Sequence, residues 1–211
     1  MSSEKTVFDR TYENYVVQLS KIDFKSVAFN LGLNSDKKRI NIPLFGKTYE
    51  VSVYGITDPS GIKPPYDICV VLCKYLLLFP YVDPKESEWV SFKDFKDAGP
   101  LTTYFANDVE RGIASYFSEK LDELKNASKA LSGYRPDLEV HYDLTVQFDA
   151  LPRVPVMMLY NDADEEFRAK CSILFERRAE RYLDAECLAI VGWQLFSHLK
   201  NAHKNTTMSD R

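Results

Sequence analysis

Four carboxylates stand within the short stretch YNDADEEF, residues 160–167. Neighbouring carboxylates supply the oxygen ligands that hard cations prefer, and they can push each other's pKa values apart for acid–base chemistry. The stretch does not match a calcium-binding loop, because Phe167 stands where that loop needs glycine and Ile173 stands where it needs a bidentate acid. One interpretation is therefore a metal or acid–base site of another kind. Its candidate ligands are Asp162, Asp164, Glu165 and Glu166.

The same four residues could instead begin a helix. Asp162 or Asp164 would then accept hydrogen bonds from the free backbone N–H groups of the first turn, as N-cap residues do. Glu165 and Glu166 would lie in that turn, where the helix dipole favours negative charge, and Phe167 would point inward. We favour this helix start over the metal site, because acidic residues are common at helix N-termini.

Two further pairs of residues could hold a metal or move a proton. Cys69 and Cys73 are four residues apart, so on a helix they share a face and could bind a soft metal. Their neighbours are aliphatic, which favours burial of both thiols in the core. His141 and Asp143 share the polar side of a predicted strand and could act as acid and base. A solvated strand face explains this second pair equally well.

Other motifs are incomplete. His198 and His203 are five residues apart, which turns them away from each other around a helix, and we expect both at the surface. The sequence GKT at 46–48 resembles part of a phosphate-binding loop, but the first glycine of that loop would fall at Asn41. The patterns G-x-G-x-x-G, G-x-S-x-G and H-E-x-x-H do not occur in the sequence. No cofactor can be named from these patterns.

Charge and composition argue against several classes of partner. The 211 residues include 31 acidic and 27 basic side chains that are interspersed, so no basic face for nucleic acid is indicated. The most apolar stretch, 68–79, contains Lys74 and is shorter than the roughly 20 residues that span a membrane. The N-terminus lacks the apolar core of a signal peptide, and the four cysteines lack the spacing of a disulfide scaffold. We therefore expect reduced thiols and a cytoplasmic location.

Hydrophobic periodicity predicts the first half of the fold. Apolar residues recur every three to five positions over 7–21, which indicates an amphipathic helix, and irregular chain should follow it. The stretch 39–55 is rich in β-branched and aromatic residues on both sides of Gly-Lys at 46–47, which predicts an antiparallel hairpin. After a Pro- and Gly-rich loop at 57–65, a helix over 66–79 is apolar nearly all round and should be central and buried.

The second half begins with a long connection and a long helix. The connection at 80–100 should be anchored on the body of the protein by Trp89 and Phe92. A helical pattern follows over 102–131, and Gly133 stands where that helix would stop. We expect this helix to be the longest.

The clearest strand signal follows at 141–149. Leu144, Val146 and Phe148 should face the core, whereas Thr145 and Gln147 should face solvent or a site. Further strands are predicted at 153–162 and 171–177, although the first residues of 171–177 could equally end a helix that begins at Asp164. A helix that Asp184 caps is predicted at 185–201, followed by a polar tail from 204.

Several of these stretches together resemble a known family. They are PPYDICVVLCKYL, EWVSFKDF with the long helix after it, YDLTVQFDALPRVPVMMLYNDADEEF and ILFERRAERYLDAECL. They are similar to a bacterial and archaeal family, frequent in anaerobes, catalogued as domain of unknown function 3786. The resemblance covers most of residues 60–200 and implies no established activity. Some relatives carry a cysteine-rich iron–sulfur segment at the N-terminus, which implies anaerobic redox or cofactor metabolism, whereas this chain has a plain helix at 7–21. Arg168 also departs from the proline or other residue that follows the acidic stretch in relatives.

Together these patterns predict an α+β domain. We expect one antiparallel sheet, built from the 39–55 hairpin and the strands within 139–177, with the helices packed mainly on one face. Residues 1–203 should form a single domain, and residues 204–211 should form a disordered tail.

For function, we favour a non-catalytic domain that binds a small molecule or cofactor, or an accessory domain in anaerobic metabolism, because no convergent catalytic set is visible. One alternative is a metal-dependent enzyme that uses the acidic stretch with Asp143 or His141. Another is a module that binds a protein partner through the loop at 80–100. A ligand would lie in a cleft between that loop, the start of the helix at 66 and the corner at 152–155. The candidate ligand-binding residues are Asp67, Trp89, Phe92, Asp143 and Pro155.

Overall fold

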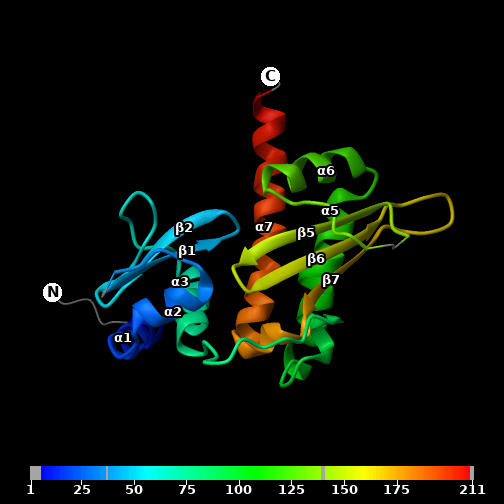
Figure 1. Ribbon diagram of the computed structural model, residues 1–211. Helices are drawn as coiled ribbons and strands as arrows, with labels where there is room; N and C mark the ends of the chain where they lie inside the picture. The colour runs from blue at the N-terminus through cyan, green and yellow to red at the C-terminus, as the bar shows by residue number, and fades with distance from the viewer. Residues whose placement is uncertain (1–5, 37, 139–140, 210–211) are drawn as a thin grey trace.

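The computed structural model describes residues 6–36, 38–138 and 141–209. They form an α+β fold, as predicted, with helices around two antiparallel sheets (Figure 1). The N-terminal lobe contains α1 (Val7–Leu19), α2 (Phe24–Leu31), β1 (Arg39–Leu44), β2 (Lys47–Ser52), β3 (Gly55–Thr57) and α3 (Tyr66–Leu77).

The C-terminal lobe contains a sheet, a group of helices and short 3₁₀ turns. Its strands are β4 (Trp89–Ser91), β5 (Leu144–Leu151), β6 (Val154–Asn161) and β7 (Lys170–Glu176). Its helices are α4 (Thr102–Tyr104), the π-helical η3 (Phe105–Glu110), α5 (Arg111–Phe117), α6 (Leu121–Ala130) and α7 (Ala185–Ser209). The 3₁₀ turns are η1 (Phe92–Asp94), η2 (Gly99–Leu101) and η4 (Arg177–Arg181).

Local capping signals explain the first two helices. α1 begins after Thr6, whose side chain forms a capping box with Asp9. α2 corrects our expectation of irregular chain after the first helix. It begins after Asp23, whose Oδ1 accepts N–H groups of the first turn, and it ends at Gly32 with a left-handed φ of 67°. Both caps are visible in the sequence, but eight residues are too few for periodicity to reveal the helix.

The predicted hairpin and the predicted central helix are both present. β1 pairs with β2 through a turn at Phe45 and Gly46, one residue earlier than expected, and Phe45 takes a positive φ of 47°. α3 is buried along most of its length, including Cys69, Cys73 and Tyr75. It contacts both α1 and α7, so it forms the centre of the N-terminal lobe.

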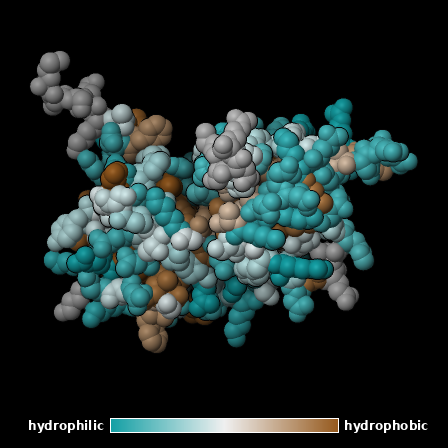
Figure 2. Space-filling model, turned by 90° about the horizontal axis from the view of Figure 1, so that it is seen from above, coloured by the Kyte–Doolittle hydropathy of each residue, from teal (hydrophilic) through white to brown (hydrophobic). Residues whose placement is uncertain are grey.

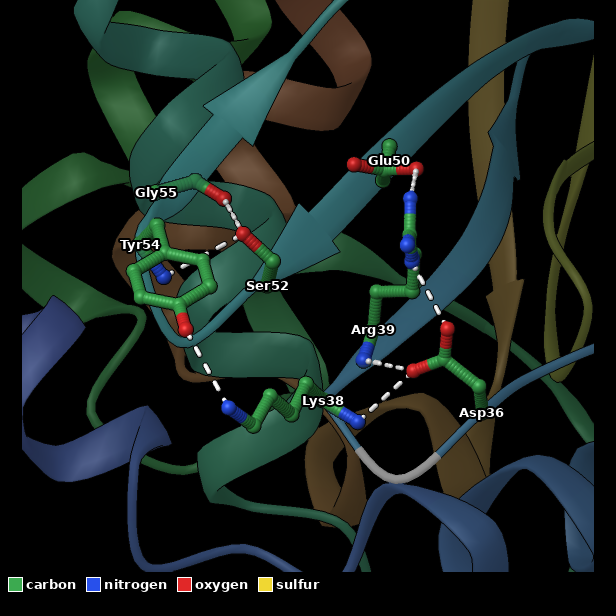
Figure 3. A network of polar contacts seen from close by, with 7 residues as sticks. All are labelled: Asp36, Lys38, Arg39, Glu50, Ser52, Tyr54 and Gly55. Carbon is green, nitrogen blue, oxygen red and sulfur yellow. Dashed lines mark hydrogen bonds and ion pairs between the residues drawn. The ribbon is translucent and has the colours of Figure 1, made fainter.

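Charged and polar side chains hold the end of the β1–β2 pair that lies away from its turn (Figure 3). The Arg39 guanidinium donates to Asp36 Oδ2 at 2.7 Å and to Glu50 Oε2 at 3.2 Å. Lys38 Nζ donates to Tyr54 Oη at 3.2 Å. Hydrogen bonds from the Lys38 N–H and from Arg39 hold the pKa of the Asp36 carboxyl below its ordinary value. Because Arg39 is shared by two carboxylates, this network stabilises the strand end and has no net positive charge to offer a ligand.

The strands form two sheets instead of the single sheet that we predicted. The N-terminal sheet has the order β1-β2-β3, and the C-terminal sheet has the order β4-β7-β6-β5. The sheets meet where the Phe45 N–H donates to the Ala150 carbonyl at 2.9 Å. Alternation shows which face of a strand is apolar but not which edges pair, so the sequence pattern did not separate the two sheets.

The predicted alternation of β5 is confirmed. Val146 and Phe148 are 5% and 1% exposed, whereas Thr145 and Gln147 are half-buried on the other face and Asp149 is exposed. β6 and β7 continue both faces in antiparallel register. We call the face of the four-stranded sheet that contains Val146 its inner face, and the face that contains Gln147 its outer face.

Helices cover the inner face of the four-stranded sheet. α5 and α7 run behind β5–β7, and α6 lies near one end of these strands (Figure 1). α7 also contacts α3, and one cluster of buried side chains extends through both lobes. With 25 residues, α7 is longer than any uninterrupted helix within 102–131, where we expected the longest helix. It continues to Ser209, so residues 204–209 extend the helix and do not form the expected tail.

The surface differs between the two lobes. Seen from the end at which α6 lies, the C-terminal lobe is mainly hydrophilic, and hydrophobic side chains are more frequent over the N-terminal lobe (Figure 2). Exposed apolar residues of that lobe include Val7, Phe8 and Phe29. Isolated apolar residues are normal on protein surfaces, so we assign them no function.

The expected helix over 102–131 is interrupted in the structure. Ser118 with ψ of 128° and Glu119 with φ of 61° leave the helical region, and α6 begins again at Leu121. The Glu119 N–H donates to Asp162 Oδ1 at 2.7 Å. A contact with a residue far along the chain therefore holds this turn, which contains neither glycine nor proline.

The π-helical segment η3 directs Glu110 at the sheet. β4 pairs with β7 only along Leu174–Glu176, so the neighbouring Ile173 N–H lies beyond the end of β4. Glu110 Oε1 accepts this N–H group at 2.9 Å. At the other end of η3, Phe105 stacks on Phe92 with ring centroids 4.3 Å apart. Single π-helical turns within α-helices are frequent at functional sites.

Glycine allows α7 to pack closely on this helical run. A Cβ atom added to Gly192 would lie 2.4 Å from Phe105 Cε2, and a Cβ atom added to Gly112 would lie 2.7 Å from Phe196 Cε1. Such distances are far inside van der Waals contact. The two aromatic rings therefore occupy the space that a side chain at either position would need.

We expect Gly192→Ala to destabilise the protein, although alanine is the better helix former by about 1 kcal/mol. The added methyl group overlaps with the Phe105 ring, and overpacking of this kind costs about 1–3 kcal/mol of unfolding free energy. Urea unfolding followed by circular dichroism measures the loss. Gly99→Ala is the matched control, because nothing lies within 4 Å of its Cβ position. Equal stability of the two variants would contradict the close packing.

We also expect Glu110→Gln to change how stability depends on pH. Burial raises the pKa of the Glu110 carboxyl, and the Ile173 N–H and Lys93 offset this only in part. The folded state therefore binds this proton more tightly, so its contribution to stability is lost as pH rises from about 4.3 through the raised pKa. The glutamine side chain of the variant would keep an acceptor for the Ile173 N–H but would not titrate.

Urea unfolding across pH 4 to 8 tests this expectation. The stability of Glu110→Gln relative to the natural protein should increase with pH and then level off. The exposed Glu123→Gln on α6 is the control for general charge effects. A Glu110→Gln difference that stays constant or reverses with pH would refute the assignment.

Candidate functional site

The acidic stretch forms a loop between β6 and β7, and no helix begins there. The helix start that we favoured is therefore wrong. β6 and β7 are adjacent antiparallel strands whose last pair is Asn161 and Lys170, so the loop at 162–169 must reverse the chain. In Figure 1 this loop extends beyond the sheet, away from the N-terminal lobe.

The aspartates of this loop serve as acceptors for donors of the protein itself. Asp162 Oδ1 accepts from Glu119 N at 2.7 Å, Ala163 N at 2.8 Å and Tyr160 Oη at 3.1 Å. Burial and the bond to Asp162 raise the pKa of the Tyr160 hydroxyl. The Asp162 carboxylate therefore holds both the end of β6 and the non-helical turn that precedes α6.

Asp164 organises the tip of the same loop. Its Oδ1 accepts from Phe167 N at 2.6 Å and from Glu166 N at 2.9 Å, and these bonds hold the pKa of the carboxyl below its ordinary value. Glu165 and Glu166 have exposed side chains, and so does Phe167, which we expected to point inward. The tip is therefore a side-chain-stabilised turn.

These carboxylates do not converge in the way that a metal site requires. Within residues 6–36, 38–138 and 141–209, no group of three or more His, Cys, Asp or Glu side chains is placed to hold a metal ion. Asp143 Oδ2 instead accepts the Asp162 N–H at 2.8 Å, and His141 is exposed. The use of the acidic stretch by an enzyme stays a prediction that this geometry does not favour.

Burial explains the two cysteines of α3. Cys69 and Cys73 are fully buried, as expected for core residues, and burial raises their pKa values to about 11 and about 12. Both are therefore thiols at neutral pH and poor ligands for a soft metal. The expectation of surface histidines needs correction. His198 packs on Phe45 with ring centroids 5.4 Å apart, and His203 Nδ1 lies 3.2 Å from Tyr116 Oη.

The structure does not bring the five candidate ligand residues into one cleft. Asp67 accepts a hydrogen bond from Gln194 Nε2 of α7 at 3.1 Å. Phe92 is buried against Phe105, so it anchors the 80–100 connection as predicted. Of the remaining three, Trp89 and Pro155 lie in the four-stranded sheet, and Asp143 directly precedes β5.

The sheet separates these three residues. Trp89 pairs with Glu176 and Pro155 pairs with Asp149, and the register of β6 and β7 sets Pro155 beside Glu176. Trp89 and Pro155 thus share one row of the outer face. Asp143 lies at the opposite end of β5, where it lines a different pocket.

That pocket lies between α6 and the start of β5, and we call it the α6–β5 pocket. Its volume is about 360 Å³. α6 contributes one wall, the segment 133–138 after it a second, and residues 142–146 the third. The side chains that matter most for its chemistry are Lys125, Ser128, Lys129, Tyr134, Arg135, Tyr142 and Asp143.

The helix wall follows from the spacing of α6. Lys125, Ser128 and Lys129 are three and four residues apart, so they share one face of the helix. Lys125 Nζ is paired with Asp122 Oδ1 at 2.9 Å. Ser128 is 2% exposed, and its Oγ has no hydrogen-bond partner among the residues that the structure describes.

The second wall is held tightly against β5. A Cβ atom added to Gly133 would lie 2.6 Å from Val146 Cγ1, so only glycine allows this approach. Tyr134 exchanges two backbone hydrogen bonds with Gln147, at 3.0 and 2.8 Å. Its hydroxyl donates to Asp149 Oδ1 and accepts from Gln147 Nε2. Tyr134 therefore forms an isolated β-bridge with Gln147 at the open edge of β5.

The described lining of the pocket contains more cationic than anionic side chains. In the described part of the chain, Lys129 and Arg135 have no acidic partner within ion-pair distance. Among the described residues, Asp143 is the one carboxylate of its lining, and the Asp162 N–H already donates to it. Of our sequence candidates, only Asp143 lies here. The spacing of Lys125 and Lys129 before Gly133 was the signal that could have indicated the site.

We expect Asp162→Ala to lower the unfolding free energy by about 2–3 kcal/mol, because three donors lose a charged acceptor. Glu165→Ala, in the exposed part of the same loop, should change it by less than about 0.5 kcal/mol. Urea unfolding of both variants measures the difference. If Asp162→Ala is no less stable than Glu165→Ala, the proposed anchor of the loop is wrong.

Comparisons with known proteins place the chain in a family. No helix in the described ranges combines the length and the hydrophobicity that crossing a membrane requires. No curated protein and no solved structure matches the chain. A family model described as Domain of unknown function (DUF3786) matches residues 23–198, which contain both sheets and the α6–β5 pocket. The chain therefore belongs to this family, DUF3786.

Proposed function

We propose that this protein binds a small organic anion in the α6–β5 pocket and acts as a ligand-binding domain. The observation that carries the proposal is the combination of two cations, Lys129 and Arg135, with the buried Ser128 hydroxyl, none of which has a charged or hydrogen-bonding side-chain partner among the described residues. A buried hydroxyl without a partner costs free energy, which a ligand group could recover. The two cations would select an anion for that position.

The remaining lining fits an apolar or aromatic ligand body. Tyr142, Leu138 and Val146 supply apolar surface, and Tyr134 is held in place by its bonds to β5. A volume of about 360 Å³ lies within the usual range of roughly 300–1,000 Å³ for small-molecule sites. Apolar walls with a few polar groups are the usual composition of such a site.

The anionic group would be a phosphate or a carboxylate. Arg135 can donate two parallel hydrogen bonds to either group, and Lys129 adds a flexible point charge. Asp143 would repel a second negative charge, so we expect a ligand with one anionic end. The tie to anaerobic metabolism and the cytoplasmic location stay predictions from the sequence.

Isothermal titration of the full chain with three matched probes tests this proposal. Phenyl phosphate carries an aromatic ring and an anion, benzyl alcohol carries the ring alone, and benzylamine carries the ring with a cation. We expect phenyl phosphate to bind most tightly, and its affinity should fall as salt increases. Lys129→Met and Arg135→Met should each weaken it about fivefold or more, since each removes a charge-assisted contact worth ~1 kcal/mol or more.

Lys85→Met, at an exposed lysine of the connection before β4, is the matched control and should bind as the natural protein does. Ser128→Ala should weaken binding without lowering unfolding stability, because it removes a buried hydroxyl that has no partner in the described protein. The proposal fails if phenyl phosphate and benzyl alcohol bind equally. It also fails if neither Lys129→Met nor Arg135→Met alters phenyl phosphate binding.

A further inference from the structure

A second, smaller cavity lies at the open edge of β7, and we call it the β7-edge cavity. Its volume is about 230 Å³. It exists because β4 ends at Ser91, opposite Leu174, whereas β7 begins four residues earlier at Lys170. The cavity shares no lining residue with the α6–β5 pocket. Its lining includes Phe92, Lys93, Phe105, Glu110 and Ser172.

Two opposite charges line this cavity without pairing with each other. Glu110 comes from η3 and Lys93 from η1, and no ion pair joins them in the described protein. Burial raises the pKa of the Glu110 carboxyl, and the nearby positive charge of Lys93 offsets part of this rise, so the two charges are close enough to interact. Unpaired opposite charges in one small cavity are complementary to a ligand that carries both charges.

The position of Glu110 is held by the fold. Oε1 accepts the Ile173 N–H at 2.9 Å, which orients the carboxylate and leaves Oε2 for another donor. Burial of the carboxyl raises its pKa, so a cationic partner would stabilise its charged form. Lys93 is exposed and stands at the cavity's solvent side.

An apolar wall completes the cavity. The rings of Phe92 and Phe105 are stacked, with an interplanar angle of 11°, and both line the space beside Glu110. Both rings are fixed by the core, and Phe105 also packs on Gly192 of α7. A ligand with a short apolar part would find a rigid surface there.

We propose that the β7-edge cavity binds a small zwitterion of the amino-acid class, with its ammonium group at Glu110 and its carboxylate at Lys93. A simple anion would be repelled by Glu110, and a simple cation would be repelled by Lys93. The volume of about 230 Å³ is sufficient for an amino acid with a small side chain. This proposal does not rest on the α6–β5 pocket.

Nuclear magnetic resonance titration of the full chain tests the proposal. The probes are glycine, L-alanine, L-valine, β-alanine and γ-aminobutyrate, which vary the apolar part and the separation of the two charges. Acetate and ethylammonium each carry one of the charges. We expect at least one zwitterion to shift the Ile173 and Ser172 amide signals in a saturable way. It should bind at least about tenfold more tightly than either single-charge probe.

Three variants locate the bound zwitterion. Glu110→Gln keeps an acceptor for the Ile173 N–H but removes the charge, and Lys93→Met removes the opposite charge. Each should weaken the best zwitterion at least about tenfold. Lys129→Met, in the α6–β5 pocket, should leave zwitterion binding unchanged and serves as the control.

Several results would overturn the inference. They are the absence of saturable shifts with all five zwitterions, equal binding of a single-charge probe, or unchanged binding in both Glu110→Gln and Lys93→Met. Circular dichroism and unfolding curves confirm that each variant is folded, so that lost binding can be assigned to the charge. Phenyl phosphate titration of Glu110→Gln keeps the two proposals separate, because a failure at one cavity leaves the other unaffected.

Discussion

The contact between Gly192 of α7 and the Phe105 ring is the constraint on which much of the C-terminal lobe depends. Because Gly192 has no side chain, the Phe105 ring can occupy the space beside it, and the two helices approach closely. Gly112 and Phe196 form the same kind of contact. α7 also contacts α3, so the same helix carries the packing of both lobes. A change at this crossing would therefore move the sheet relative to its helices and the lobes relative to each other.

The π-helical turn follows from the same contact. Phe105 must lie between Gly192 and Phe92, and Glu110 must reach the Ile173 N–H at the unpaired edge of β7. A regular α-helix places residues five apart about 140° away from each other around its axis, whereas a π turn brings them closer together. The wider turn lets both ends of η3 face the sheet. A half-buried carboxylate beside the β7-edge cavity is the result.

How much of this could be predicted depends on where the controlling interactions lie. The alternation of Val146 and Phe148, the all-round burial of α3 and the Asp184 cap of α7 depend on local patterns, and the structure has all three. The interruption of the helix before α6 depends on Asp162, which is 43 residues from Glu119. No residue near the interruption indicates it in the sequence. The same bond explains why our prediction of a helix start in the acidic stretch was wrong. Asp162 accepts a hydrogen bond from the turn at Glu119 and begins no helix.

The candidate sites were harder to predict than the fold for a related reason. Asp143 was the only predicted site residue in the α6–β5 pocket, because the cationic groups come from α6 and the segment after it. Lysines on a helix usually indicate a solvent-exposed face. Only the return of the chain at Gly133 brings β5 opposite these lysines. Trp89 and Pro155 lie in the same row across the sheet, but Glu176 of the intervening strand β7 lies between them.

Both cavities lie where the hydrogen-bond ladder of the four-stranded sheet stops. At the β5 edge, Tyr134 pairs with Gln147 in the position that a further strand would occupy. The segment 133–138, which contains Arg135, passes beside α6 there. At the β7 edge, Glu110 takes the place of the missing part of β4. A polar group drawn to an open strand edge satisfies the backbone there, and it brings charge next to apolar surface. Cations line the cavity at the β5 edge, whereas a carboxylate and a lysine line the cavity at the β7 edge. The two cavities would therefore select ligands of different charge, and a single sheet could serve both.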